Sequence, residues 1–148
     1  EVTIGRFPTT GVAEIMTEGG NLSGVELSED LVPLLLDELP ILAIAALFAD
    51  GRTTIKGASE LRVKESDRIK AMVNELRKLG ADIEELLDGM VIKGGAKLKG
   101  AEVSSYHDHR IAMSLSVLGL VLPDVKVIDP ECVNISFPDF HQSLSLFR

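Results

Sequence analysis

The stretch Lys64-Glu65-Ser66-Asp67-Arg68, which follows Arg62-Val63, holds the side chains best suited to chemistry. Cationic, carboxylate and hydroxyl groups stand together there, and the stretch opens a predicted amphipathic helix. A helix N-terminus favours anions, because its free backbone N–H groups and the helix dipole carry partial positive charge. The stretch therefore indicates a site for a phosphorylated or carboxylated ligand.

Two further polar clusters, Asp37-Glu38 and Asp108-His109-Arg110, also stand at predicted helix starts. In a protein built from repeats, equivalent helix ends can converge on one surface. Arginine forks suit carboxylate and phosphate, whereas lysine supplies a point charge. Converged, the three helix starts would form an anion clamp with carboxylates among the cations (Lys64, Arg68, Arg110, Asp37 and Glu65).

Plainer interpretations stay open at each cluster. Asp37 and Asp108 could be ordinary helix N-caps, and composition alone favours a solvated helix face for Lys64 to Arg68. His109 is better suited to a structural or orienting hydrogen bond than to a metal. Three histidines and the single Cys132 give no metal-ligand spacing, so we predict neither a metal site nor a cofactor.

The elements that must position these clusters begin with two apolar segments, Leu39 to Ala49 and Ile111 to Leu122. Both are apolar on nearly every side and shorter than the roughly 18 residues of a membrane span, which predicts helices buried on all faces. Asp37 and Asp108 would cap them. Short β-like runs follow, at positions 52–56 and 125–128.

Other segments have the patterns of surface elements. A helix from Ser66 to Leu79 carries apolar residues at helical spacing and ends at Gly80. Ala81 to Leu86 and Met90 to Lys93, joined through Asp88-Gly89, predict a hairpin. A second amphipathic segment, 137–147, ends the chain.

Helix, strand, loop and amphipathic helix thus occur twice, from Asp37 to Leu79 and from Asp108 to Phe147, and superposing Ile55 on Val127 gives an offset of 72 residues. Thr10 to Ile15 is interpreted as a remnant of a third amphipathic helix, although the link over 16–25 is short and Gly-rich. The repeat predicts an α/β or α+β domain in which apolar helices are enclosed by sheets.

Composition restricts the partners. The chain has 148 residues, of which 45% are apolar, and a net charge of -8, so neither nucleic acid nor an anionic membrane would be drawn to it. Aromatic residues make up 4%, with no Trp for stacking bases. The lone Cys132 excludes an internal disulfide and the first residues lack a signal-peptide pattern, so we expect a cytoplasmic protein.

Four motifs, read in order, resemble the 5-enolpyruvylshikimate-3-phosphate (EPSP) synthases from Gly24 to Phe147. They are Asp37-Glu38-Leu39-Pro40, Arg62 to Arg68, Asp108-His109-Arg110-Ile111-Ala112-Met113 and Ser136-Phe137-Pro138-Asp139-Phe140. Pro8 to Val12 is similar to a further family segment. The resemblance implies one domain of a two-domain inverse α/β barrel. Residues 1–148 would be a partial C-terminal domain, with 1–24 a poorly matched remnant of an earlier repeat and 25–148 well matched.

The resemblance also implies an activity, the transfer of an enolpyruvyl group from phosphoenolpyruvate to the 5-hydroxyl of shikimate 3-phosphate with release of phosphate. The missing N-terminal domain would be this chain's partner, and we expect the chain alone to be inactive. By the same resemblance Asp37 is a base near the shikimate hydroxyl and Glu65 exchanges protons with the methylene carbon. Arg68 and Arg110 grip phosphoenolpyruvate, Lys64 faces the shikimate phosphate, and His109 supports the site.

One departure from the family pattern is Ile135, where several members carry a lysine. Two alternatives to this activity stay open. The first is the related transferase that acts on a UDP-linked amino sugar, which the charged motifs fit less well. The second is a non-catalytic binding or assembly domain of the same fold.

Overall fold

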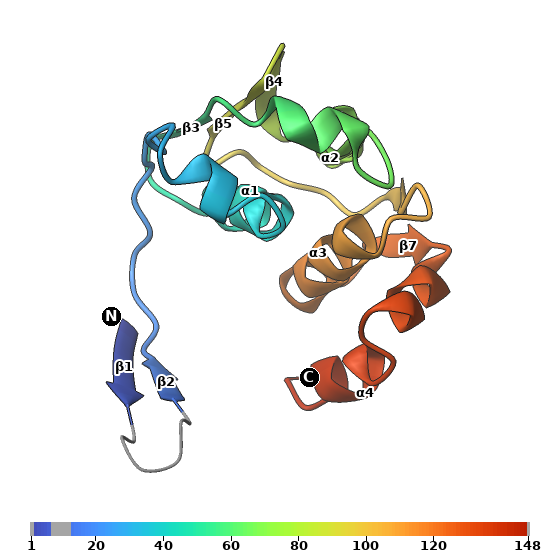
Figure 1. Cartoon of the computed structure of the whole chain (residues 1–148). Coiled ribbons are helices and arrows are strands. Elements are labelled where there is room, and N and C mark those ends of the chain that lie inside the picture. Colours follow the sequence, from blue (N-terminus) through green and yellow to red (C-terminus); the bar gives the residue numbers. More distant parts are fainter. Residues whose placement is uncertain (1, 7–12, 148) are drawn as a thin grey trace.

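A computed structural model describes residues 2–6 and 13–147. The strands are β1 Val2–Arg6, β2 Ala13–Thr17, β3 Arg52–Ile55, β4 Asp82–Leu86, β5 Gly89–Lys93, β6 Glu102–Ser104 and β7 Lys126–Ile128. The α-helices are α1 Leu39–Leu47, α2 Arg68–Lys78, α3 His109–Val121 and α4 Phe140–Ser145. Three short 3-10 helices lie between them, η1 Val32–Leu34, η2 Ser59–Val63 and η3 Pro130–Ile135. This mixture of helices and sheets confirms the predicted fold class (Figure 1).

Helices α1 and α3 lie side by side at the centre of the fold, as their sequences predict. Every residue of α1 is buried or half-buried, and in α3 only the last residue, Val121, is exposed. The cause is their composition, because a helix that is apolar all round has no face that gains from contact with water. Among the described residues, none of the helices is long and apolar enough to cross a bilayer.

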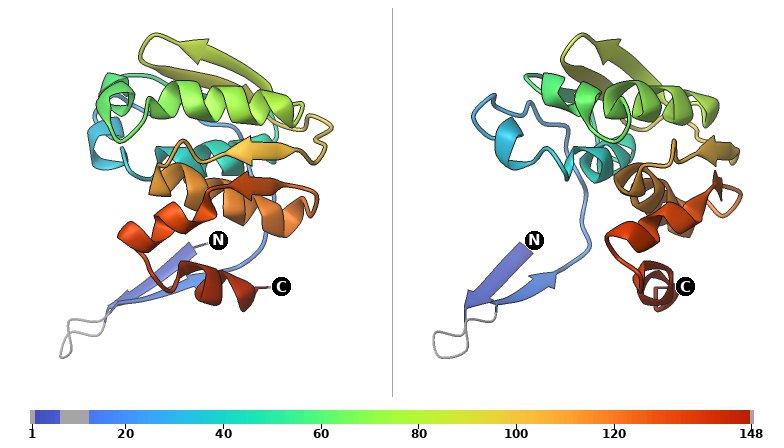
Figure 2. Two further views of the ribbon diagram at one scale, coloured as in Figure 1. Left: turned by 90° about the vertical axis from the view of Figure 1, so that its right-hand side faces the viewer. Right: turned by 45° about the vertical axis from the view of Figure 1, so that its right-hand side comes forward.

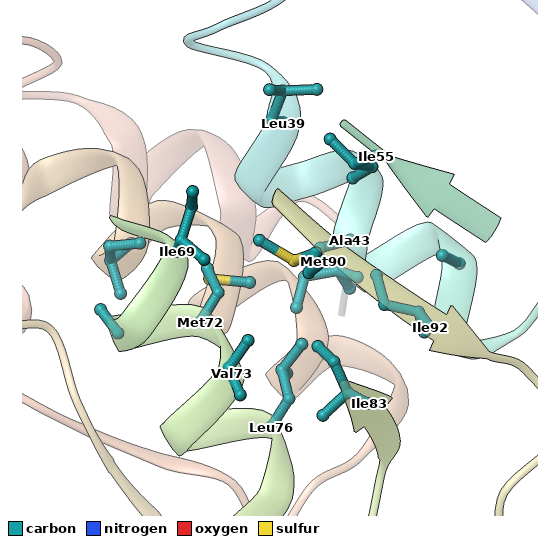
Figure 3. Close-up of a cluster of buried hydrophobic side chains, with 14 of the residues drawn as sticks. Leu39, Ala43, Ile55, Ile69, Met72, Val73, Leu76, Ile83, Met90 and Ile92 are labelled. Carbon is teal, nitrogen blue, oxygen red and sulfur yellow. The ribbon is translucent and has the colours of Figure 1, made fainter. Parts of the chain in front are cut away.

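Helix α2 and the three-stranded sheet cover one side of the core. The strand order is β3-β5-β4, and both pairs are antiparallel. Val91 of the central strand β5 lies opposite Thr54 of β3 on one side and opposite Glu84 of β4 on the other. Figure 3 shows apolar side chains of α2 meeting those of β5 and α1. Those of α2 at the predicted helical spacing are fully buried, namely Ile69, Met72, Val73 and Leu76. The amphipathic helix and the hairpin are therefore confirmed.

The second half of the chain repeats the order of elements of the first half, with a smaller sheet. Strand β7 pairs in parallel with β6, and α3, β7, η3 and α4 follow one another as α1, β3, η2 and α2 do (Figure 2). Helices α2 and α4 begin at Arg68 and Phe140, which are 72 positions apart. The predicted repeat is thus present, whereas β6 was not predicted, because three residues are too few to show an alternating pattern.

The first strands correct one prediction. Ala13 to Ile15, interpreted as part of an amphipathic helix, lies in β2, which pairs antiparallel with β1 and sets Ile15 opposite Ile4. Apolar and polar residues alternate at Ala13-Glu14-Ile15, which suits a strand, and the partner strand supplies the pairing. Residues 10–12 of that prediction lie outside the described part. The β1–β2 hairpin stands away from the helices (Figures 1 and 2).

The start of α2 and the cap of α1 also differ from prediction. Helix α2 begins at Arg68, not Ser66, because the Asp67 carboxylate accepts the backbone N–H of Lys70 at 3.0 Å and so caps the helix there. Helix α1 has Glu38 at its N-cap, without a side-chain cap bond. Asp37 is therefore not the cap that the sequence predicted.

Gly94 allows β5 to pass close to the end of α1. A Cβ at this position would lie 1.9 Å from the carbonyl oxygen of Ala49 and 2.8 Å from that of Ala46. We expect Gly94→Ala to lower the free energy of unfolding by about 1–3 kcal/mol, because the backbones must move apart. Urea unfolding would measure it. Gly20→Ala is the control, since nothing lies within 4 Å of its Cβ; equal effects of the two changes would contradict the prediction.

Candidate functional site

A buried arginine joins the three predicted polar clusters. The Arg68 side chain is 1% exposed, and its guanidinium donates to three carboxylates. Nε lies 2.8 Å from Asp108 Oδ2, Nη1 3.0 Å from Asp37 Oδ1 and Nη2 2.7 Å from Glu65 Oε2. A guanidinium is always charged, so it can be buried only when such partners compensate the lost water.

Each carboxylate comes from a different part of the chain. Asp37 precedes α1, Glu65 lies in the bend between η2 and α2, and Asp108 is the N-cap of α3. The predicted convergence of helix starts on one site is therefore what the structure shows. The ion pair of Glu65 with Arg68 forms across a bend and not, as predicted, within one helical turn.

Asp108 is the fixed point of this network and is completely buried. Its Oδ1 accepts the backbone N–H groups of Arg110 at 2.9 Å and Ile111 at 3.4 Å, which confirms it as the cap of α3. Its Oδ2 accepts Arg68 Nε and, at 3.0 Å, the Ser66 hydroxyl. Burial opposes its ionisation, but the hydrogen bond and charge of Arg68 outweigh burial, so the pKa of Asp108 lies below its ordinary value.

Asp37 and Arg110 form the open side of the site. Asp37 Oδ2 accepts Arg110 Nη2 at 3.4 Å, and Arg110 Nη1 lies 3.6 Å from Glu38 Oε1. The side chains of Asp37 and Arg110 are 51% and 30% exposed. Burial again opposes ionisation of Asp37, yet the Arg68 hydrogen bond and the charges of Arg110, Arg68 and Lys64 hold its pKa below the ordinary value.

A hollow of about 190 Å³ adjoins this open side, and both Asp37 and Arg110 line it. Its other walls are mainly apolar and come from α1, α3 and α4 (Ile41, Met113, Val117 and Phe140). Charged and apolar groups together are the usual lining of a small-molecule site.

Two further predicted site residues lie at the margin of this network. Lys64 pairs with Glu60 at 2.6 Å, at the end of η2. His109 is the first residue of α3 and is half-buried. No hydrogen bond from its ring is present within residues 2–6 and 13–147, so its supporting role stays a prediction.

Sequence analysis missed the part played by Arg62, which fixes the bend that carries Glu65. Arg62 donates to the carbonyl oxygens of Leu86 at 2.6 Å and Leu87 at 2.7 Å, at the β4–β5 turn. It also binds the Asp67 carboxylate at 2.8 Å. The sequence places Arg62 next to the charged stretch, but no spacing rule connects it with carbonyl groups about 25 residues away.

No group of three or more histidine, cysteine or acidic side chains able to hold a metal ion occurs in the described part of the chain. What the site offers is cationic donors and carboxylates in an α/β domain of repeated helix–strand units. The chain is thus an α/β domain whose charged site is formed where three of its helices begin.

Comparison with known proteins identifies the family. The family model described as EPSP synthase (3-phosphoshikimate 1-carboxyvinyltransferase) matches residues 3–144, and the chain belongs to this family. It is 51% identical over 136 residues to the 3-phosphoshikimate 1-carboxyvinyltransferase of Thermoanaerobacter sp. (strain X514), covering 91% of this chain and 32% of that protein. The enzyme of the same name from Persephonella marina is 54% identical over 125 residues, 84% of this chain and 29% of its own length.

Solved structures agree with the sequence relatives. EPSP synthase from Acinetobacter baumannii superposes with a TM-score of 0.90 at 40% identity, over 99% of this chain and 35% of that one. The chain thus spans about a third of the length of the proteins that it matches.

Removing Asp108 should expose the dependence of the fold on this network. We expect Asp108→Ala to lower the free energy of unfolding by about 3–5 kcal/mol at neutral pH, because Arg68 Nε would be buried without its partner. The pKa of Asp108 is lowered on folding, so the stability that this carboxylate contributes is present above its unfolded value of 3.8 and declines as pH falls through the folded value. The difference from the unsubstituted protein should therefore narrow in acid.

Urea unfolding at neutral and at acidic pH measures both effects. Asp139→Ala is a matched control, because Asp139 precedes α4 but is exposed and makes no side-chain cap bond. We expect it to change stability by less than about 0.5 kcal/mol. A loss for Asp108→Ala that did not vary with pH would show that its charge is not what stabilises the fold.

Proposed function

We propose that this chain is part of an enzyme that transfers the enolpyruvyl group of phosphoenolpyruvate to the 5-hydroxyl of shikimate 3-phosphate, with release of phosphate. The supporting observation is the convergence of Arg68, Arg110, Asp37 and Glu65 from three helix starts, in a chain that belongs to the EPSP synthase family. Both substrates are small anions with phosphate and carboxylate groups. The compartment that we propose is the cytoplasm.

Arg110 is the group that an incoming anion can reach. Its two ion pairs, at 3.4 and 3.6 Å, are longer than those of Arg68, and its side chain is partly exposed. A substrate carboxylate could therefore replace Asp37 and Glu38 as its partner and bind in the bidentate manner that guanidinium favours. This exchange would also free Asp37 from one of its cations.

Arg68 would contribute its charge from the buried side of the site. Three of its five N–H donors are bonded to carboxylates and its side chain is 1% exposed, so it would act on a ligand mainly through its charge. Its charge stays fixed because it is buried among its partners. Arg68 would then stabilise the phosphoenolpyruvate carboxylate while it holds Glu65 and Asp37 at defined positions.

The reaction would proceed by addition and elimination. Glu65 would give a proton to the methylene carbon of phosphoenolpyruvate, so that the central carbon becomes electrophilic and the 5-hydroxyl adds to it. Asp37 is a carboxylate whose lowered pKa makes it a weak base, and it would accept the hydroxyl proton once Arg110 has turned to the substrate and so left it more basic. Removal of a methyl proton by Glu65, with departure of phosphate that takes up the proton held by Asp37, would restore the double bond as an enol ether and return both carboxyl groups to their starting states.

The shikimate phosphate would be held partly outside this chain. Lys64 could supply one cation if its side chain left Glu60. Ile135 is exposed but carries no charge, so it supplies no cation. Since the chain spans about a third of its relatives, the other wall of the cleft would come from the rest of the protein. We therefore expect the chain by itself to have no transferase activity.

Calorimetric titration tests the proposed function. The chain would be titrated with shikimate 3-phosphate and then phosphoenolpyruvate, alone and together with the remaining part of the family's sequence taken from the Persephonella marina relative. We expect tight binding only when both parts are present. If the combined parts bind neither substrate, the enzyme proposal fails and a non-catalytic domain of this fold is favoured. Binding of a UDP-linked amino sugar instead would indicate the related transferase.

Glu65→Gln tests the proton-transfer assignment in the longer protein. The amide keeps the size of the side chain but cannot exchange a proton, so turnover should fall by about 10²–10⁴-fold. Shikimate 3-phosphate binding should persist, as measured by calorimetry. Glu84→Gln, the same change at an exposed residue of β4, is the control and should retain full turnover. Near-normal turnover of Glu65→Gln would exclude Glu65 as the proton donor.

A further inference from the structure

Helix α2 carries a second buried charge, Glu75, that the proposed reaction does not use. Its side chain is 0% exposed. Its Oε1 accepts the Tyr106 hydroxyl at 2.9 Å, and its Oε2 accepts the backbone N–H of Ser104 at 2.9 Å and Lys78 Nζ at 2.6 Å. Two of these three donors belong to the segment that leads into α3.

That segment has an unusual backbone. Tyr106 and His107 have φ angles of 56° and 58°, in the left-handed region that residues other than glycine seldom adopt. Two local bonds brace the turn, from Tyr106 N to Ser104 Oγ and from His107 N to Ser105 Oγ, both 3.2 Å. Since two successive left-handed residues are strained, the surrounding contacts must hold them in place.

The turn ends at the site, because the residue that follows His107 is Asp108, the partner of Arg68. Arg68 and Glu75 lie seven residues apart on α2, which is about two helical turns, so their side chains leave the same face. Helix α2 therefore binds the segment 104–108 at two points. Glu75 binds the beginning of the segment and Arg68 binds its end.

We propose that Glu75 is a positioning residue, which through Tyr106 and Ser104 fixes the turn that sets Asp108 and Arg110 against Arg68. The inference rests on the proposed function for its kinetic test. It explains why a carboxylate is buried here: all three groups that meet it are donors, and a carboxylate is the side chain that only accepts. An amide in its place would turn N–H toward at least one donor.

The coupling of Glu75 to Tyr106 can be observed directly. Burial raises the pKa of the Tyr106 hydroxyl, and the Glu75 hydrogen bond and charge raise it further, while Asn74 and Lys78 act in the opposite direction. Tyr106 is the single tyrosine of this chain. In the longer protein its labelled ring carbon can be titrated by NMR and assigned with Tyr106→Phe. We expect Glu75→Gln to lower this pKa; an unchanged pKa would overturn the coupling.

Steady-state kinetics of the longer protein test the positioning role. Tyr106→Phe and Glu75→Gln should raise the KM for phosphoenolpyruvate by roughly 10-fold, since Arg110 is displaced, and leave the KM for shikimate 3-phosphate within about twofold. Glu84→Gln, a matched change at an exposed carboxylate, should alter neither. If Glu75→Gln does not fold, Tyr106→Phe decides, because it removes a single hydroxyl group.

Failure of this inference and failure of the proposed function would give different results. Unchanged KM for phosphoenolpyruvate in folded variants, with or without a loss of thermal stability, would overturn the inference and leave Glu75 a purely structural residue. Absence of enolpyruvyl transfer by the unsubstituted protein would instead refute the proposed function.

Discussion

The buried guanidinium of Arg68 is the interaction on which the remaining structure depends. A charge that is 1% exposed must find its partners within the protein, and here they come from three separate helix starts. Any arrangement of α1, α2 and α3 that failed to bring these starts together would leave the charge uncompensated. The network that forms the site is therefore also a constraint on how the helices pack.

The network divides into a fixed part and an open part. Arg68 and Asp108 are buried and bonded at short distances, so their positions are determined by the fold. Asp37, Glu65 and Arg110 surround them but reach solvent, and the Arg110 pairs are long. A ligand of the kind proposed could therefore exchange partners at the open part without moving the buried pair. The lowered pKa values of Asp37 and Asp108 extend further into acid the pH range in which both are carboxylates.

Much of this could be predicted from sequence, and the exceptions share a physical cause. The buried helices, the hairpin and the repeat follow from local periodicity, and the convergence of helix starts follows from the repeat. The start of α2 could not be predicted, because Asp67 and Ser66 are both capping residues and tertiary contacts chose between them. The bonds of Arg62 to carbonyl oxygens and of Glu75 to a backbone N–H are long-range contacts with groups that every residue carries.

The repeat explains the shape of the site as well as its fold. Arg68 and Phe140 are the equivalent first residues of α2 and α4, so one copy of the unit begins its outer helix with a cation and the other with an aromatic ring. Phe140 lines the hollow beside Arg110, whereas Arg68 lies beneath Asp37 at its charged end. The two equivalent positions thus carry side chains of opposite chemical character, one charged and one apolar. The hollow is therefore lined by charged side chains, Asp37, Glu38 and Arg110, together with the apolar ring that the second copy of the unit supplies, and charged and apolar groups together are the usual lining of a small-molecule site.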